Sequence, residues 1–294
     1  MALKDEIAAS GVAKLEAGSG GLEKIVIDAP AARGEMYLHG AHVTSFTPRG
    51  QKPVIFLSKD SLYQPDKPIR GGVPICFPWF GPKADDRAAP MHGVARISPW
   101  KFESIERVGD GARAVLSLVP NEVSRKYWPH EFAARFIVTF GATLEMSLLV
   151  QNTGRSHFTY QEALHSYLTV GDVRKITLTG LERTKYLDKV IKETKVEGDA
   201  PIRITGETDR VYLGTTASCV VDDPGLRREL SVEKSGSNVT VVWNPWIDRS
   251  KALADFGDQE WPGMLCVETA NTADFAIQLA PGESHTIRAI VRVD

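Results

Sequence analysis

The sequence has few cysteines, no long apolar run and no apolar N-terminal segment. Its three cysteines, Cys76, Cys219 and Cys266, lie far apart and form no CxxC pair, which argues against a disulfide framework or a zinc site and favours reduced, buried thiols. No uninterrupted apolar stretch approaches the roughly 20 residues of a membrane span. The N-terminal MALKDEIAAS carries three charged residues where a secretory signal needs its apolar core. We therefore expect a cytoplasmic protein that does not enter a membrane.

The chain also has almost no net charge and lacks the common cofactor and metal motifs. Its 35 Lys and Arg residues are balanced by 37 Asp and Glu residues, so no excess charge would attract nucleic acid or an anionic membrane. There is no GxGxxG after a predicted strand, no GxxxxGK[ST] and no GxSxG, which excludes the usual dinucleotide, P-loop and hydrolase signatures. No histidines have HxH, HxxxH or HExxH spacing, so the sequence disfavours a metal site. Any anionic ligand must be held by local charges.

Short β-rich runs fill most of the chain. Residues 1–20 have apolar residues at roughly helical spacing and end in AGSGG, which predicts a leader segment with a short helix. After it, segments such as TLEMSLLVQNTG alternate with Gly, Pro, Asn and Asp, a pattern typical of an all-β sandwich or barrel rather than a βαβ fold. No polar linker divides residues 21–294, so we expect a single domain there.

The segment PIRGGVPICFPWFGP, residues 68–82, places an arginine beside an aromatic wall. Its four prolines rule out a long helix, and the aromatic side chains of Phe77, Trp79 and Phe80 are costly to leave in water on a flexible loop. Their neighbour Arg70 therefore becomes a candidate binding residue at the edge of a rigid apolar surface.

A second arginine follows after a polar loop, in the segment MHGVAR. We expect His92 and Arg96 to return the chain to the neighbourhood of Arg70. Two guanidinium groups suit a carboxylate or phosphate because each can donate bidentate hydrogen bonds. The alternative for each arginine is an ordinary surface ion pair.

A histidine and a glutamate in two predicted strands are candidates for proton transfer. In EALHSYLTV, alternation puts His165 on the same face as Tyr167; the alternative is a core histidine satisfied by a carbonyl group. In MLCVETAN, Glu268 shares a face with apolar residues. A carboxylate in such surroundings is either a buried ion-pair partner or a base with a raised pKa.

Two further features could complete a pocket. Asp209, in GETDRVYL, comes just before an apolar strand, where it either caps a turn or faces a ligand. The segment VVWNPWIDRSKALADFGDQEWPGM is long enough to form a lid or rim between two strands. Together, two histidines, two carboxylates, two arginines and an aromatic wall describe a pocket with the chemistry of a sugar site.

These segments, in this order, resemble a known family. IRGGVPICFPWFGP, HGVAR, ALHSYL, TDR, VVWNPW, KALADFGDQEW and MLCVETAN are similar to the glucose-6-phosphate 1-epimerases, or hexose-6-phosphate mutarotases, of the aldose 1-epimerase group, from about residue 20 to the C-terminus. The resemblance implies a galactose mutarotase-like supersandwich of antiparallel sheets. It also implies interconversion of the α and β anomers of a hexose 6-phosphate, without a cofactor.

The resemblance also implies roles for individual residues. His165 matches the catalytic acid and Glu268 the catalytic base, and the substrate-binding positions are matched by Arg70, His92, Arg96 and Asp209. The mechanism expected from this match has Glu268 take the C1 hydroxyl proton while protonated His165 delivers a proton to the ring oxygen.

The chain departs from the family pattern at two positions. Met91 stands where some members carry a glutamine before the HG pair, and its thioether cannot replace an amide donor. Trp79 stands where plant-type relatives carry glutamine, so we expect aromatic stacking on the sugar to replace an amide contact there.

Two other functions fit the same residues. An aldose 1-epimerase acting on free hexoses would keep His165 and Glu268 but would not need the arginines. A non-catalytic sugar-phosphate-binding protein could use the same sandwich, although an acid–base pair favours an enzyme. In each case we expect a small-molecule partner, no nucleic acid, and a monomer.

Overall fold

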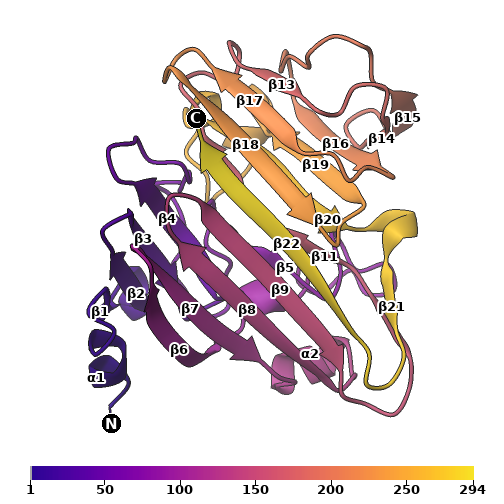
Figure 1. Cartoon of the computed structure of the whole chain (residues 1–294). Helices are drawn as coiled ribbons and strands as arrows, with labels where there is room; N and C mark the ends of the chain where they lie inside the picture. Colours follow the sequence, from indigo (N-terminus) through magenta and orange to yellow (C-terminus); the bar gives the residue numbers. More distant parts are fainter. Residues whose placement is uncertain (1) are drawn as a thin grey trace.

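The computed structural model describes residues 2–294, and antiparallel β-strands dominate it (Figure 1). The all-β prediction is therefore confirmed. The α-helices of the described residues are short: α1 (Leu3–Ala8), α2 (Glu122–Tyr127) and α3 (Trp246–Lys251). Single turns of 3₁₀-helix are η1 (Ser19–Gly21), η2 (Ala95–Ile97), η3 (Trp261–Gly263) and η4 (Ala273–Phe275). No helix within residues 2–294 has both the length and the apolar character needed to cross a bilayer.

One eight-stranded sheet, the site sheet, carries most of the residues singled out in the sequence. Its strand order is β15-β14-β16-β19-β20-β11-β5, and β12 pairs with β20 beside this path. The strands are β5 (Ile75–Cys76), β11 (Glu162–Leu164), β12 (Tyr167–Thr169), β14 (Lys185–Asp188), β15 (Glu193–Val196), β16 (Thr208–Leu213), β19 (Val239–Asn244) and β20 (Met264–Asn271).

A second eight-stranded sheet, the support sheet, runs in the order β13-β17-β18-β22-β9-β8-β7-β6. Its strands are β6 (Lys101–Val108), β7 (Gly111–Leu118), β8 (Phe132–Phe140), β9 (Leu144–Asn152), β13 (Thr177–Thr179), β17 (Cys219–Asp223), β18 (Arg228–Ser235) and β22 (Ser284–Val293). β10 (Phe158–Tyr160) and β21 (Ile277–Leu279) form a separate pair.

The N-terminal part of the chain forms a four-stranded sheet, seen at the left of Figure 1 with α1 below it. Its strands are β1 (Ala13–Ala17), β2 (Glu23–Asp28), β3 (Ala32–Tyr37) and β4 (His42–Pro48). The helix expected in the leader is thus only six residues long, because Gly11 adopts a positive φ of 69° and the chain then enters β1. β1 pairs with β2, so strands on both sides of residue 20 belong to the same sheet.

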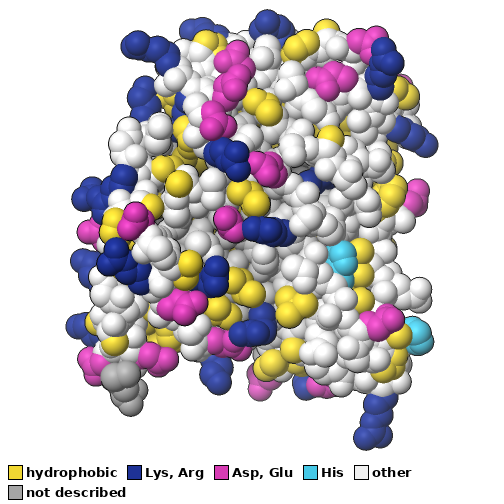
Figure 2. Space-filling view, viewed as in Figure 1, with side chains coloured by type: hydrophobic (Ala, Val, Ile, Leu, Met, Phe, Trp, Pro, Cys, Tyr) yellow, Lys and Arg dark blue, Asp and Glu magenta, His cyan; other side chains and the backbone are white. Residues whose placement is uncertain are grey.

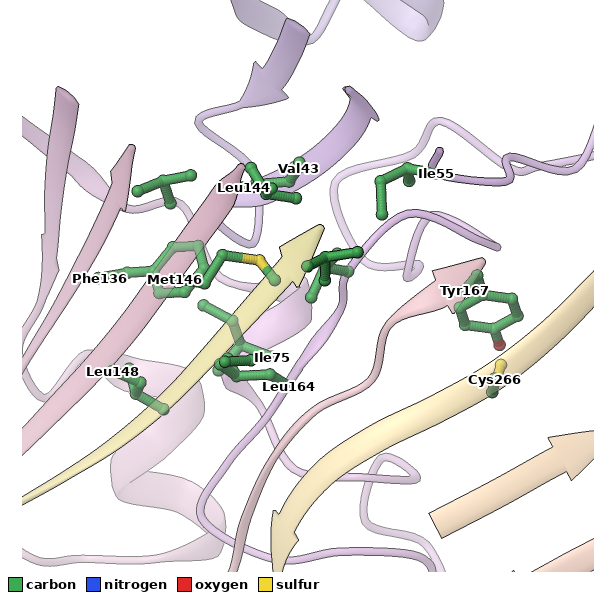
Figure 3. Close-up of a cluster of buried hydrophobic side chains, with 14 of the residues drawn as sticks. Val43, Ile55, Ile75, Phe136, Leu144, Met146, Leu148, Leu164, Tyr167 and Cys266 are labelled. Atoms are coloured by element: carbon green, nitrogen blue, oxygen red, sulfur yellow. The ribbon is translucent and has the colours of Figure 1, made fainter. Parts of the chain in front are cut away.

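The main hydrophobic core lies between the two large sheets. Figure 3 shows Phe136 of β8 with Leu144, Met146 and Leu148 of β9 gathered near Ile75 and Leu164 of the site sheet, all fully buried. Strict alternation along β8 and β9 buries every second residue on this inner face. On the surface seen in Figure 2, basic and acidic side chains are interspersed with hydrophobic and uncharged ones.

A buried polar cluster joins the two large sheets beside this core. Asn271 at the end of β20 donates to Glu162 Oε1 (3.0 Å) and to the carbonyl of Gly236 (2.7 Å). His285 of β22 donates from Nε2 to the same carbonyl (2.8 Å) and lies 3.2 Å from Glu162 Oε1. The Glu162 carboxyl is fully buried, and burial raises its pKa. The hydrogen bond to Glu162 in turn raises the pKa of His285 above its ordinary value of 6.5.

We predict that His285→Gln destabilises the protein in a pH-dependent way. A raised folded-state pKa contributes stability that is complete below pH 6.5 and is lost as the pH rises through the folded value. The free energy of unfolding should therefore fall by about 1.5–3 kcal/mol at pH 6 and by about 1 kcal/mol or less at pH 9. Denaturant unfolding at both pH values measures this, with the exposed His157→Gln as control. A loss independent of pH would contradict the ion-pair assignment.

Candidate functional site

The RGG sequence of residues 70–72 is required by a close backbone crossing. Gly71 and Gly72 have φ values of 97° and 68°, a region that strongly favours glycine. A Cβ on Gly71 would lie 2.7 Å from the backbone of Leu57, and one on Gly72 would lie 2.4 Å from the carbonyl oxygen of Val43. The two glycines therefore let the loop pass against β4 and the segment after it, which brings the Arg70 side chain to the site sheet.

The register of the site sheet aligns the other side chains. Asp209 of β16 is paired with Trp243 of β19, Trp243 with Cys266 of β20, and Cys266 with Tyr167 of β12. Directly paired residues project to the same face of a sheet. Glu268 lies two residues after Cys266, on this same face. His165 and Glu268 thus lie on the faces predicted for them, although His165 lies between β11 and β12 rather than within one continuous strand.

These side chains line a cavity of about 260 Å³. All six residues predicted as catalytic or substrate-binding lie on its wall: Arg70, His92, Arg96, His165, Asp209 and Glu268. The remaining lining residues are Phe80, Met91, Tyr167, Lys189, Glu207, Val241, Trp243, Arg249 and Leu253. The structure therefore brings together residues that are up to 198 positions apart in the chain, from Arg70 to Glu268.

His165 and Glu268 form a close pair at the most buried part of the cavity. His165 Nε2 lies 3.3 Å from Glu268 Oε1, and the two side chains are 8% and 1% exposed. The His165 ring stacks on Tyr167, with 4.7 Å between centroids and 12° between planes. Glu268 Oε2 and His165 Nδ1 are buried without a hydrogen-bond partner. An unpartnered carboxylate oxygen beside an oriented imidazole is an arrangement suited to an acid–base pair.

Burial drives the pKa values of the two groups in opposite directions. Burial is the largest cause that raises the pKa of Glu268 well above its usual range, and repulsion from Asp209 is the second. Burial is also the largest cause that holds the pKa of His165 well below its usual range, and the positive charges of Arg96 and Arg70 come next. Each shift favours the neutral form of its group, because burial disfavours both the Glu268 carboxylate and the His165 imidazolium.

His92 is fixed in one tautomer. Its Nδ1 accepts a hydrogen bond from the Gly81 backbone N–H (3.2 Å) and lies 3.5 Å from Cys76 Sγ. Burial, together with the charge of Arg96, lowers the pKa of His92. A neutral ring that accepts at Nδ1 carries its proton on Nε2, so His92 can act as a hydrogen-bond donor.

Both predicted arginines have partners within the protein. Arg70 Nη2 forms an ion pair with Asp255 Oδ2 (3.0 Å), and Nη1 donates to the Tyr167 hydroxyl (3.2 Å). Arg96 Nη2 donates to the carbonyl of Met91 (2.7 Å), and its side chain is buried. Asp255 lies in the long segment predicted as a lid or rim, and this ion pair connects that segment to the RGG loop.

The expected aromatic wall is only partly correct. Phe80 lines the cavity, together with Tyr167 and Trp243. The prediction that Trp79 stacks on the sugar is wrong, because its ring is 6% exposed, does not line the cavity, and donates from Nε1 to the Pro90 carbonyl (2.9 Å). Phe77 is likewise a core residue, 1% exposed.

The sequence did not identify three charged residues of the cavity: Lys189, Glu207 and Arg249. Lys189 directly follows β14, Glu207 precedes β16, and Arg249 lies on α3. Two of them lie inside segments already singled out, since Glu207 is two residues before Asp209 and Arg249 lies in the predicted rim. No segment identified in the sequence analysis contains Lys189. Among residues 2–294, no three His, Cys, Asp or Glu side chains are grouped so as to hold a metal ion.

Comparison with known proteins places these features in a family. The family model described as Aldose 1-epimerase matches residues 23–292. The chain is 36% identical to the "Putative glucose-6-phosphate 1-epimerase" of Cenchrus ciliaris, over 90% of this chain and 82% of that protein. It is 35% identical to the protein of the same name from Escherichia coli K12, over 86% of this chain and 84% of that protein.

Solved structures agree with this fold. The crystal structure described as a "putative mutarotase" from Salmonella typhimurium superposes with a TM-score of 0.90 at 32% identity, covering 96% of this chain and 94% of that one. The galactose 1-epimerase of Lactobacillus acidophilus gives a TM-score of 0.72 at 12% identity, covering 96% and 98% of the two chains. This more distant likeness extends to the fold alone, and it confirms the predicted galactose mutarotase-like supersandwich.

The burial of Glu268 predicts a stability cost at high pH. A folded-state pKa raised above 4.5 gives stability that is present below that value and is lost as the pH rises through the folded pKa. We expect Glu268→Gln to match the unaltered protein at pH 5. At pH 9 it should be more stable by about 1 kcal/mol or more, or roughly 2–4 °C in Tm. Thermal unfolding at the two pH values measures the difference. Equal destabilisation at both would indicate that the carboxylate is a net structural contact.

Proposed function

The chain belongs to the aldose 1-epimerase family, and from this membership we propose that it interconverts the α and β anomers of a hexose 6-phosphate. The protein is an isomerase. The observation that carries the proposed activity is the buried pair of Glu268 and His165, 3.3 Å apart at the base of a cavity that also presents four cationic side chains. Glucose 6-phosphate is the substrate named for the relatives in C. ciliaris and E. coli, and it is the substrate proposed here.

The reaction needs two proton transfers and no covalent intermediate. A base takes the proton of the C1 hydroxyl, the C1 carbonyl forms as the bond from C1 to the ring oxygen breaks, and an acid protonates that oxygen. Rotation about the C1–C2 bond then exposes the other face of the aldehyde. The reverse transfers close the ring as the other anomer. We assign the base to Glu268 and the acid to His165.

Substrate binding favours the protonated form of His165 that its role as an acid requires. Burial, followed in size by the positive charges of Arg96 and Arg70, depresses the pKa of this imidazole. A phosphate dianion entering the same cavity offsets these positive charges in surroundings of low dielectric constant. It thereby raises the pKa of His165, whose Nε2 lies 3.3 Å from Glu268 Oε1.

The other predicted residues bind the sugar. Asp209 is three-quarters buried from solvent at its side chain and can accept from a hydroxyl, and neutral His92 can donate to one. Arg96 is a buried donor and Arg70 a partly buried one in the same cavity. Such fixed groups hold the C1 hydroxyl and the ring oxygen within reach of the acid–base pair.

The direct test is anomer exchange measured by two-dimensional exchange NMR, with catalytic amounts of protein. We expect faster exchange of glucose 6-phosphate, with a much smaller effect on free glucose, because free glucose cannot supply the charge that protonates His165. Acceleration of free glucose alone would favour an aldose 1-epimerase of unphosphorylated hexoses. If glucose 6-phosphate binds and no exchange is accelerated, the protein is a sugar-phosphate binder.

Removing either member of the pair should abolish catalysis without unfolding the protein. We expect Glu268→Gln and His165→Asn each to lower kcat for glucose 6-phosphate by about 10²–10⁴-fold, the range lost with a general acid or base. The same NMR assay measures this. Glu106→Gln, at an exposed position of β6 outside the cavity, is the control. Full turnover by Glu268→Gln would remove that residue from the mechanism.

We also propose that the protein acts as a monomer in the cytoplasm and binds no nucleic acid. Its three cysteines are unpaired and buried, which suits a reducing compartment. Its net charge is −2, and the face seen in Figure 2 carries both signs of charge interspersed. Sedimentation at several protein concentrations tests the oligomeric state.

A further inference from the structure

Residues 245–263, which link β19 to β20, form a rim of the cavity that is held at its base by one side chain. The buried amide of Asn244 accepts at Oδ1 from the Trp246 backbone N–H (2.9 Å). Its Nδ2 donates to the carbonyls of Trp261 (2.8 Å) and Met264 (2.9 Å). The rings of Trp246 and Trp261 also lie 4.3 Å apart. Both ends of the rim are therefore fixed to the site sheet.

The far part of the rim packs against the segment that precedes the RGG loop. The Glu260 carboxylate accepts a hydrogen bond from the Ser58 hydroxyl (2.6 Å). Phe256 is 2% exposed, and its ring centroid lies 5.8 Å from that of Phe56. Asp255 directly precedes Phe256, so these contacts also determine where its carboxylate lies.

Asp255 does not line the cavity but forms an ion pair with a residue that does. Its Oδ2 lies 3.0 Å from Arg70 Nη2, and the two side chains are 15% and 19% exposed. The other terminal nitrogen of Arg70, Nη1, donates to the Tyr167 hydroxyl (3.2 Å). The guanidinium is planar and its donors have a fixed geometry. Partners on both terminal nitrogens therefore set its orientation.

Tyr167 connects Arg70 to the acid–base pair. Its side chain is 1% exposed, and its ring stacks on that of His165 with 4.7 Å between centroids and 12° between planes. His165 Nε2 in turn lies 3.3 Å from Glu268 Oε1. A continuous series of contacts thus runs from Asp255 on the rim to the two groups that transfer protons.

The charge of Arg70 acts on the same imidazole. Burial lowers the pKa of His165 most, and the charges of Arg96 and then Arg70 lower it further. The Asp255 carboxylate, 3.0 Å from Arg70 Nη2, offsets part of this positive charge. Because an acid must hold a proton before it can donate one, the carboxylate favours the form of His165 that the reaction needs.

From these contacts we propose that Asp255 is a positioning residue of the reaction, which holds the Arg70 guanidinium in one orientation and thereby keeps Tyr167 stacked on the acid. The proposal rests on the proposed function. Since Asp255 lies outside the cavity wall, it acts through Arg70 and not by contact with the sugar. The rim then supports the acid in addition to forming part of the wall.

The test removes the carboxylate with little change in the shape of the side chain. Asp255→Asn is compared with Asp258→Asn, a matched control on the same rim that is exposed and does not line the cavity. Arg70→Gln and the double variant complete a double-mutant cycle. Exchange NMR gives kcat for glucose 6-phosphate, and calorimetric titration with this sugar gives Kd independently of turnover.

A second readout needs no turnover. Isotope labelling of the histidine rings makes the Cε1 proton of His165 visible by NMR, and this proton senses the stacked Tyr167 ring. The variant His165→Asn assigns the signal. The exposed His157 serves as an internal reference.

We expect Asp255→Asn to lower kcat about tenfold, because a small displacement of reacting groups is enough for such a loss. Its Kd for glucose 6-phosphate should not rise, since removing a negative charge does not weaken the binding of an anion. The His165 signal should shift and the His157 signal should not. In the Arg70→Gln background, Asp255→Asn should lower kcat no further. Asp258→Asn should behave as the unaltered protein.

Other outcomes overturn the proposal. An unchanged kcat and an unchanged His165 signal in Asp255→Asn would mean that Tyr167 alone orients the guanidinium. A higher Kd with kcat unchanged would make Asp255 a support of the cavity wall only. Additive losses of kcat in the double variant would mean that Asp255 does not act through Arg70.

Failure of the proposed activity is a separate result. If the unaltered protein binds glucose 6-phosphate but does not accelerate its anomer exchange, the assignment as a mutarotase fails. The His165 signal of Asp255→Asn still decides whether the carboxylate fixes the stacked rings, because this measurement needs neither substrate nor turnover.

Discussion

The rest of the site depends on the burial of one carboxyl group, that of Glu268. A carboxylate at 1% exposure with one oxygen unpartnered is unfavourable, and the fold maintains it because β20 is a central strand, paired with β19, β11 and β12. The same solvent-poor surroundings also shift the pKa of its neighbour His165. Burial lowers the pKa of His165, and the charges of Arg96 and Arg70 lower it further because they are little screened. The pKa values of the groups in the cavity thus depend on how deeply β20 is buried.

Part of this arrangement could be predicted from the amino-acid sequence alone. The motifs around Arg70, Arg96, His165, Asp209 and Glu268 each carry a local signal, either unusual glycines and prolines or a charge among apolar residues. All of them meet in one cavity. The all-β class was equally accessible, because strands such as β8 and β9 alternate strictly between buried residues and partly or fully exposed ones. These features are encoded within a few neighbouring positions.

The features that escaped prediction depend on contacts between distant segments. Lys189 is an ordinary lysine in a turn, and only the pairing of β14 with β16 brings it beside Asp209. The ion pair of Arg70 with Asp255 joins segments 185 positions apart. Trp79 was misassigned because a run of aromatic residues does not reveal which of them faces inward. The short helix predicted in the leader is present as α1, but the strand β1 that follows it and pairs with β2 was not predicted.

The wall of the cavity has two structural origins. Its buried residues lie in or directly beside the central strands of the site sheet, where any shift of register would displace several side chains at once. Lys189 and Arg249 lie instead in a turn after β14 and on the six-residue helix α3, whose sequences are not constrained by cross-strand pairing. Substitutions in these two short segments can therefore change the charge of the cavity wall while the strands that hold Glu268 keep their register.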